Sequence, residues 1–345
     1  MRIAIVAPAW FAVPPSGYGG IEWVVSLLAD GLVAAGHDVT LFAAGDSRTK
    51  AQLVSVHAEA PSALIGRSMP ELHHSLSCYA RADEFDVIND HSGMLGAVLG
   101  ATVDTPVVHT AHGPLEAEPG QIYELIGKLA PHVGLISISM NQRRPKPHLN
   151  WIANCPNALD LSVYPFRPRQ PHDDYLLFLG RMSPDKGAHR AIAVAMEAGL
   201  PLKLAGKRHD PKEFTYFHEF VEPHLVDGIE YLGEVSHGEK VELLQNARAT
   251  LFPIEWEEPF GLVMIESMAC GTPVIATRWG AVPEVIDHGR SGIIVDDYRI
   301  IPAALEEADK LDPYDIRRYV EQEFSAERMV RDYVGAYRKI IEQRR

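Results

Sequence analysis

Two glutamates lie at the start of an apolar helix, one just before it and one within it. Glu258 stands just before a Pro-Phe-Gly turn, and Glu266 lies eight positions later, inside a helix predicted for residues 261–269. A carboxylate is a pure hydrogen-bond acceptor and can bind the hydroxyl groups of a sugar or a ribose. The free N–H groups at the helix start, around Gly261 and Leu262, can hold a phosphate. Each acid taken alone could also be a solvated residue at a helix start, where the helix dipole stabilises a negative charge. That alternative does not explain why an acid precedes a helix that is so apolar.

A pair of cations follows a different apolar run. Residues 179–187 read LGRMSPDKG, which places Arg181 and Lys186 on a turn after the strand predicted for residues 175–180. Two fixed cations at the end of a strand suit a diphosphate, and each is worth about 4 kcal/mol at ~4 Å and an effective dielectric near 20. The alternative is a solvated turn that carries two ordinary surface charges.

A glycine-rich turn, SGYGGIE at residues 16–22, follows the first predicted strand. Its glycines let the backbone approach a ligand, and the helix that begins there attracts anions. The dinucleotide fingerprint GxGxxG fails because its sixth position is Glu22, although Asp46 stands where a ribose-binding acid would be expected. The turn therefore disfavours an NAD-linked oxidoreductase, and a mobile glycine turn without a ligand stays open.

These segments lie in a chain where strand-like and helix-like stretches alternate, which is typical of a parallel sheet with crossover helices. The pattern restarts after the linker-like segment FRPRQPHDD, residues 166–174. We therefore predict an α/β protein with two Rossmann-like, doubly wound domains that face each other across a cleft at the carboxyl ends of their strands. The predicted strands are residues 3–7, 39–43, 87–88 and 107–110 in the first half, and 175–180, 202–205, 229–232, 249–253, 274–276 and 293–295 in the second.

The predicted boundaries assign residues 1–168 to an N-terminal domain and residues 169–325 to a C-terminal domain. Residues 326–345 form a further helix, in which Tyr333 and Tyr337 belong to an apolar stripe with three- and four-residue spacing. We expect this stripe to pack back on the first domain. The alternative is a helix that lies on a membrane surface.

Composition narrows the classes of partner. The 345 residues include 32 basic and 46 acidic side chains, for a net charge of −14, which argues against nucleic acid as a main partner. The three cysteines lack any CxxC spacing and indicate free thiols in a reducing compartment. The first apolar run is too short for a signal peptide, and no stretch approaches 18 apolar residues, so we expect a cytoplasmic protein.

Taken together, the motifs resemble those of a known family. The E-x7-E motif from Glu258 to Glu266, the segment GRMSPDKG and the segment GYGGIE occur in the order found in retaining GT-B glycosyltransferases of family 4, the glycosyl transferases group 1. The resemblance extends over nearly the whole chain. It implies an enzyme that moves a sugar of the glucose or mannose class from a UDP-sugar or GDP-sugar donor to an acceptor hydroxyl, with retention of configuration.

The resemblance also implies that the domain of residues 1–168 is the acceptor side and that the domain of residues 169–325 binds the nucleotide-sugar donor, and it implies roles for individual residues. Catalysis would involve Arg181, Lys186 and Glu258, together with His112 beside the transferred sugar. Ala158, in the segment PNALD, departs from the glycine that many relatives carry, which leaves the backbone of that turn open. The donor would be bound by Gly19, Gly20, Arg181, Lys186, Gly233, Glu234, Val235, Glu258, Phe260, Gly261, Leu262 and Glu266.

No DxD motif is present, so we expect the diphosphate to be held without a metal, and no cofactor is implied. His109 and His112 would face opposite sides of a strand, which disfavours a zinc site. For the acceptor, which could be a sugar, a small molecule or a lipid-linked molecule, Glu22 and His91 are candidate contacts; His91 also fits a core or capping histidine.

The basic segment at residues 141–148 could receive an anionic acceptor or a membrane headgroup, or it could be a solvated loop. A non-catalytic nucleotide-sugar binding protein also stays open at this point. The sequence does not indicate an oligomeric state.

Overall fold

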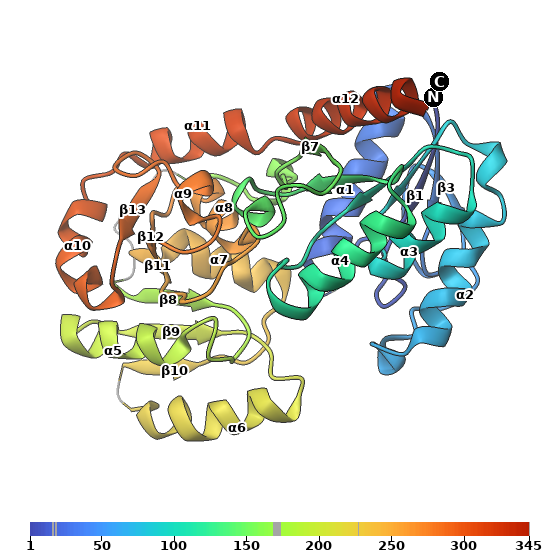
Figure 1. Ribbon diagram of the computed structural model, residues 1–345. Coiled ribbons are helices and arrows are strands. Elements are labelled where there is room, and N and C mark those ends of the chain that lie inside the picture. The colour runs from blue at the N-terminus through green and yellow to red at the C-terminus, as the bar shows by residue number, and fades with distance from the viewer. Residues whose placement is uncertain (16, 18, 168–173, 227, 345) are drawn as a thin grey trace. The chain divides into compact units, whose positions relative to one another are not determined.

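The computed structural model describes residues 1–15, 17, 19–167, 174–226 and 228–344 (Figure 1). The chain forms two compact units, one made of Met1–Leu159 with Ala326–Arg345 and the other of Asp160–Ser325. Most of the predicted linker, residues 168–173, lies outside the described residues. Among the described residues, no helix is both long enough and apolar enough to cross a membrane.

The first unit is built on a seven-stranded sheet with strand order β3-β2-β1-β4-β5-β6-β7, and all the strand pairs are parallel. The strands are β1 (Arg2–Val6), β2 (Asp38–Phe42), β3 (Gln52–Val54), β4 (Val87–Asp90), β5 (Val107–Thr110), β6 (Gly134–Ser137) and β7 (Trp151–Asn154). The helices are α1 (Gly20–Ala34), α2 (Ser68–Tyr79), α3 (Met94–Leu99), α4 (Ala117–Leu129) and α12 (Ala326–Arg344).

The second unit has a six-stranded parallel sheet in the order β10-β9-β8-β11-β12-β13. Its strands are β8 (Leu176–Leu179), β9 (Leu202–Ala205), β10 (Ile229–Tyr231), β11 (Ala249–Phe252), β12 (Val274–Thr277) and β13 (Gly292–Val295). Its helices are α5 (Ala188–Ala198), α6 (Pro211–Phe220), α7 (His237–Asn246), α8 (Leu262–Ala269), α9 (Val282–Val285), α10 (Ile301–Ala308) and α11 (Pro313–Glu323). Short 3-10 helices lie at Ser62–Leu64, Ala82–Glu84, Gly100–Thr102, Asn141–Arg143, Leu161–Val163, Glu222–His224 and Tyr298–Ile300.

The central strands are buried along their whole length, as expected for parallel sheets that helices cover on both faces. In each unit the strand order reverses beside the first strand, because β1 lies between β2 and β4 and β8 lies between β9 and β11. Ligands of doubly wound sheets bind outside the carboxyl ends of the strands at such a reversal. The prediction of two Rossmann-like domains is confirmed.

The boundary between the units falls after Leu159, earlier than the predicted boundary after residue 168. The segment that follows Leu159 belongs with the second unit because its side chains pack there. The Tyr164 hydroxyl donates a 2.7 Å hydrogen bond to Glu266, and the Phe166 ring lies edge-on to Tyr314, with centroids 5.1 Å apart.

Helix α12 belongs to the first unit, and its apolar stripe is buried there. The rings of Tyr333 and Tyr337 are fully buried. The Tyr337 hydroxyl donates to Oδ1 of Asn89 in β4 at 2.6 Å, and the Tyr333 hydroxyl donates to Oγ1 of Thr110 in β5 at 3.4 Å. The last helix therefore supports the two strands whose ends carry the candidate histidines.

Candidate functional site

The turn after β8 positions the two predicted cations. Gly187 ends this turn and precedes α5 with a φ of 82°, and a Cβ there would come within 2.6 Å of the Pro253 carbonyl oxygen, so only glycine fits. The Arg181 guanidinium donates to Glu213 at 3.0 Å and approaches Asp185 at 3.5 Å. Both cations therefore stand at the carboxyl end of β8, as predicted from the sequence.

Lys186 and Glu258 form an ion pair between the ends of two neighbouring strands, β8 and β11. The Lys186 ammonium also lies 4.7 Å from the centre of the Trp256 ring. The side chains of Lys186 and Glu258 are only 18% and 10% exposed, so water screens their attraction weakly. The structure thus brings a predicted diphosphate-binding cation together with a predicted sugar-binding acid.

The backbone fixes the position of Glu258. Its carbonyl accepts from the N–H of Ala281 at 2.9 Å, and its own N–H donates to the Trp256 carbonyl at 2.8 Å. A Cβ on Gly280 would lie 2.2 Å from the Glu258 nitrogen, so the close approach of these two segments requires glycine. The carboxylate is therefore held at one point of the strand end.

Helix α8 begins directly after Gly261, which takes the left-handed conformation with a φ of 84°. Phe260 is buried, and its ring lies edge-on to Phe324. The N–H of Met264 donates to the Gly261 carbonyl at 3.0 Å. The preceding N–H groups, those of Leu262 and Val263, have no carbonyl to bond within the helix and can serve an anion.

Glu266 is held by two partners that the sequence did not reveal. Its carboxylate accepts from the Tyr164 hydroxyl at 2.7 Å and from the Lys240 ammonium at 2.6 Å. Burial and the neighbouring carboxylate raise the pKa of Tyr164 well above its usual range, so its hydroxyl stays a donor. Neither Tyr164 nor Lys240 lies in a recognisable motif. The position of Lys240 in the first turns of α7 is the one sequence feature that could have indicated its contact with Glu266.

Gly233, Glu234 and Val235 follow β10. The Gly233 carbonyl accepts from the N–H of Gly206 at 2.8 Å, which ties the ends of β10 and β9 together. The Glu234 side chain is exposed. The segment therefore stands at the same edge of the sheet as Arg181.

In the first unit, the glycine-rich turn leads into α1. Ser16 and Tyr18 of this motif lie outside the described residues. A Cβ on Gly19 would lie 2.7 Å from Pro15 and 2.9 Å from a carboxylate oxygen of Glu22. Gly20 begins the helix, and Glu22 is buried in its first turn.

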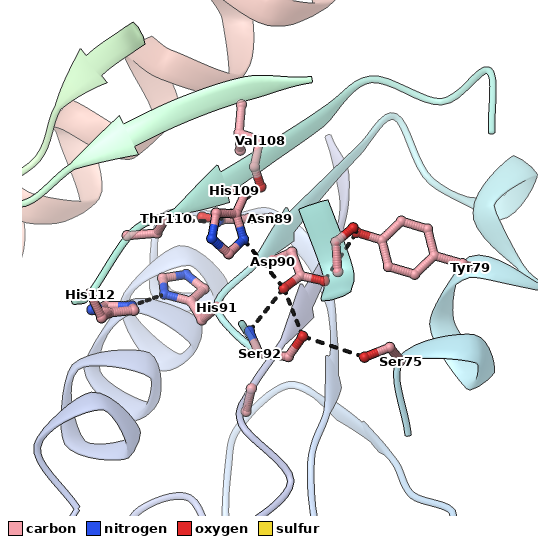
Figure 2. Close-up of polar contacts among 12 residues, drawn as sticks. Ser75, Tyr79, Asn89, Asp90, His91, Ser92, Val108, His109, Thr110 and His112 are labelled. Carbon is pink, nitrogen blue, oxygen red and sulfur yellow. Dashed lines mark hydrogen bonds and ion pairs between the residues drawn. The ribbon is translucent and has the colours of Figure 1, made fainter. Parts of the chain in front are cut away.

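His91 and His112 follow the neighbouring strands β4 and β5 and contact each other (Figure 2). Nδ1 of His91 lies 2.9 Å from Nε2 of His112, and the rings are inclined by 29°. His91 is 2% exposed, whereas His112 is partly exposed. Burial lowers the pKa of His112 to about 3 and holds the pKa of His91 well below its usual range, so both rings are neutral at physiological pH.

A buried polar network supports the end of β4 behind the histidine pair (Figure 2). Asp90 is fully buried and accepts from the Tyr79 hydroxyl at 3.0 Å and from both the N–H and the hydroxyl of Ser92 at 2.8 Å. A Cβ on Gly96 would lie 2.0 Å from the Asp90 carboxylate. His109 lies 3.7 Å from Asp90 and contacts the Tyr123 hydroxyl at 2.8 Å. Within the part of the chain that the structure describes, no three His, Cys, Asp or Glu side chains are grouped so that they could hold a metal ion.

Two cations of the basic segment at residues 141–148, Arg143 and Lys146, make contacts inside the first unit. Nε of Arg143 donates to Ser137 at 2.7 Å, and its guanidinium lies 5.2 Å from the centre of the Trp151 ring. Lys146 pairs with Glu124 at 2.7 Å. Arg144 is exposed and donates to the amide oxygen of Asn141 at 3.1 Å, so its charge is not paired with an acid in these contacts. An anionic ligand and a solvated loop both stay open for this segment.

Comparison with known proteins places this geometry in a family. Residues 165–311 match the family described as glycosyl transferases group 1, and residues 18–157 match glycosyltransferase family 4. The chain is 25% identical to glycogen synthase of Mycobacterium tuberculosis, over 85% of this chain and 82% of that protein.

Two solved structures share the fold. AviGT4, a glycosyltransferase involved in avilamycin A biosynthesis, is 25% identical with a TM-score of 0.72, over 99% of this chain and 98% of that chain. HepE of Anabaena, solved in complex with UDP-glucose, is 17% identical with a TM-score of 0.70, over 99% of both chains. The chain is thus a glycosyltransferase with the GT-B fold and belongs to the group 1 glycosyltransferases of family 4.

Proposed function

We propose that this enzyme transfers a sugar of the glucose or mannose class from a nucleotide diphosphate sugar to an acceptor hydroxyl, with retention of configuration and without a metal ion. The ion pair of Lys186 with Glu258 carries the proposal, because it joins a phosphate-binding cation to a sugar-binding acid across two adjacent strand ends. A donor has its phosphate and its transferred sugar joined by the bond that breaks, so both groups are needed at one place.

The second unit offers a partner for each part of the donor. Arg181, Lys186 and the free N–H groups at the start of α8 suit the diphosphate, and Glu266 suits the ribose hydroxyls. The segment of Gly233, Glu234 and Val235 would read the base. UDP is favoured over GDP as the nucleotide because the structural relative HepE binds UDP-glucose.

Stabilisation of the departing diphosphate would supply the largest catalytic effect. As the glycosidic bond breaks, negative charge grows on the phosphate, and the fixed cations and helix N–H groups are already in place to receive it. These groups would do the work that a metal ion does in enzymes that carry a DxD motif. The departing phosphate itself would take the proton of the acceptor hydroxyl, which is consistent with retention.

In the first unit, His112 would lie beside the transferred sugar, Gly19 and Gly20 would approach the distal phosphate, and Glu22 would contribute to the acceptor site. The three cysteines are buried and unpaired, which supports a cytoplasmic location.

A donor panel tests the proposal. UDP-glucose, GDP-mannose and NAD are each added at about 100 times their expected Kd, where a true ligand stabilises the fold by about 2.7 kcal/mol. We expect a rise in Tm with a UDP-sugar and none with NAD, followed by release of UDP and formation of an α-linked product, detected by NMR. A rise in Tm without turnover on any acceptor would point to a non-catalytic binding protein, and no shift with any nucleotide sugar would contradict the donor assignment.

A further inference from the structure

The contact between Nδ1 of His91 and Nε2 of His112 is a hydrogen bond only if one of these two nitrogens carries a proton and the other does not. Each ring is neutral, so each carries one N–H and one bare nitrogen. Either His91 donates from Nδ1 to Nε2 of His112, or His112 donates from Nε2 to Nδ1 of His91. The two arrangements differ in what they leave at the other nitrogen of each ring.

The burial of His91 decides between them. Nε2 of His91 is buried and has no hydrogen-bond partner. If His112 were the donor, His91 would carry its proton on this nitrogen, and a buried N–H without an acceptor costs about 1–3 kcal/mol. If His91 is the donor, only a lone pair is left unpaired there, and buried N–H groups without partners are rarer than underused acceptors.

We propose that His91 is a positioning residue that donates its Nδ1 proton to His112 and thereby fixes His112 as the tautomer protonated on Nδ1. Figure 2 shows the second ring nitrogen of His112 on the side away from His91. His112 then presents a hydrogen-bond donor, not an acceptor, on its partly exposed side. The inference rests on the proposed function in one respect, the placement of His112 beside the transferred sugar.

The surroundings of His91 hold its ring in the orientation that this role requires. Its backbone N–H donates to the Val6 carbonyl at the end of β1 at 2.8 Å. Its ring lies beside the Tyr333 ring of α12, with centroids 5.9 Å apart and an angle of 34°. Thr110, which accepts from Tyr333, belongs to the strand that leads to His112. The donor ring, the acceptor ring and the helix behind them are therefore parts of one packed arrangement.

A neutral His112 with its proton on Nδ1 suits a neutral sugar hydroxyl. It can donate to a hydroxyl oxygen of the transferred sugar without placing a full positive charge beside a ring that gains positive charge as the bond breaks. A histidine protonated on Nε2 would turn a lone pair toward the same hydroxyl and would require the sugar to be the donor. The tautomer therefore decides which way this hydrogen bond runs.

The tautomer can be measured on the free enzyme by ¹⁵N NMR with labelled histidine, with the His112 signals assigned by their loss in His112→Gln. We expect His112 to carry its proton on Nδ1 in the wild type. A proton on Nε2 would overturn the proposal. This measurement needs no substrate, so it stands or falls separately from the proposed reaction.

Two substitutions at His91 connect the tautomer to catalysis. His91→Phe keeps a planar ring without a donor, whereas the amide of His91→Asn places an N–H near the position of Nδ1. We expect His91→Phe to shift His112 toward protonation on Nε2 and to lower kcat by about 10- to 100-fold, as for a misplaced catalytic group. We expect His91→Asn to recover most of both losses.

The matched control is His74→Asn. His74 is another buried histidine of this unit, but it bonds to the Ala7 carbonyl and not to His112. We expect this variant to lose stability without changing the His112 tautomer. Unchanged His112 signals in His91→Phe, or equal turnover in His91→Phe and His91→Asn, would remove His91 from the mechanism.

Discussion

In the second unit the charged site residues pair with one another, whereas in the first unit a contact between two neutral imidazoles, His91 and His112, follows the central strands β4 and β5. Lys186 and Glu258 satisfy each other, and Glu266 is held by Lys240 and Tyr164. His91 and His112 share a single proton between two uncharged rings. A ligand of the second unit must therefore rearrange ion pairs, whereas a ligand of the first unit meets a preset hydrogen-bond geometry. We infer that the second unit sets affinity for the donor and that the first unit sets the direction of individual hydrogen bonds.

The strongest test of this contrast removes a cation from the second unit. We expect Lys186→Ala to lower kcat by about 100- to 1000-fold, because under the proposed function it removes a charge that would stabilise the departing diphosphate, and it takes the ion-pair partner from Glu258. Steady-state kinetics with the donor at saturation measure the loss, and Lys310→Ala, at an exposed lysine of the same unit, is the control. Turnover near that of the wild type would exclude Lys186 from catalysis.

Substitutions of the two carboxylates of the second unit, Glu258 and Glu266, should change different kinetic constants. We expect Glu258→Gln to lower kcat by about 10- to 100-fold with a smaller change in donor KM, because under the proposed function Glu258 would contact a sugar that gains positive charge in the transition state. Glu266→Gln should mainly raise donor KM, by about tenfold, because the ribose changes little during the reaction. Measured kcat and KM for both variants decide the matter, and the opposite pattern would reverse the two assignments.

A decrease in pH should lower the free energy of unfolding of the first unit, because His91 and His112 are neutral in the folded state. The folded state holds the pKa of His112 near 3 and that of His91 below its usual 6.5, so the unfolded chain binds more protons between these values. Stability from this source is complete above about pH 6.5 and falls as the pH decreases toward 3, by at most about 1.4 kcal/mol per pH unit for each histidine. Urea unfolding at pH 7, 6 and 5 measures the slope. A slope that stays the same in His112→Gln would show that His112 does not contribute.

The helix that supports the histidines offers a smaller effect. Tyr337→Phe removes the 2.6 Å hydrogen bond to the buried Asn89, and we expect a loss of about 1–3 kcal/mol in the free energy of unfolding. Tyr333→Phe removes only a 3.4 Å contact to Thr110 and should cost less. Urea midpoints for the two variants give the comparison, and equal losses would mean that the two hydroxyl groups contribute equally despite their different distances.

The smallest expected effect is that of a chelator. Because Arg181, Lys186 and the start of α8 can meet the diphosphate charge, we expect full activity in excess EDTA. Loss of activity that manganese or magnesium restores would falsify the metal-free mechanism. The assay is the release of UDP with and without the chelator.

The sequence predicted those parts of the site that lie at strand ends and in motifs. Lys186 and Glu258 could be placed together because a parallel sheet brings the carboxyl ends of its strands to one edge. The partners of Glu266 could not, because Tyr164 is 102 positions away and Lys240 is 26 positions away, and neither belongs to a periodic or glycine-bearing pattern. The domain boundary was misplaced for a similar reason, since the packing of Tyr164 and Phe166 on the second unit leaves no trace in local composition.

The pairing of the two histidines lay within reach of the same reasoning but was not predicted. His91 and His112 each follow a strand, and β4 and β5 are neighbours in the sheet. The sequence assigned one histidine to the acceptor and the other to the sugar, because the order of the strands is not visible in local patterns. If the order of the strands had been known, the contact between the His91 and His112 rings could have been predicted.

Helix α12 has a consequence for how the protein is made on the ribosome. The strands of the first unit are synthesised first, then the whole of the second unit, and only then residues 326–344. Until that last segment emerges, Asn89 in β4 lacks the Tyr337 hydroxyl and the apolar surface that later meets α12 stays uncovered. The nascent first unit therefore lacks α12 while the second unit is translated. The packing around His91 and His112 is completed only when nearly all of these residues have been synthesised.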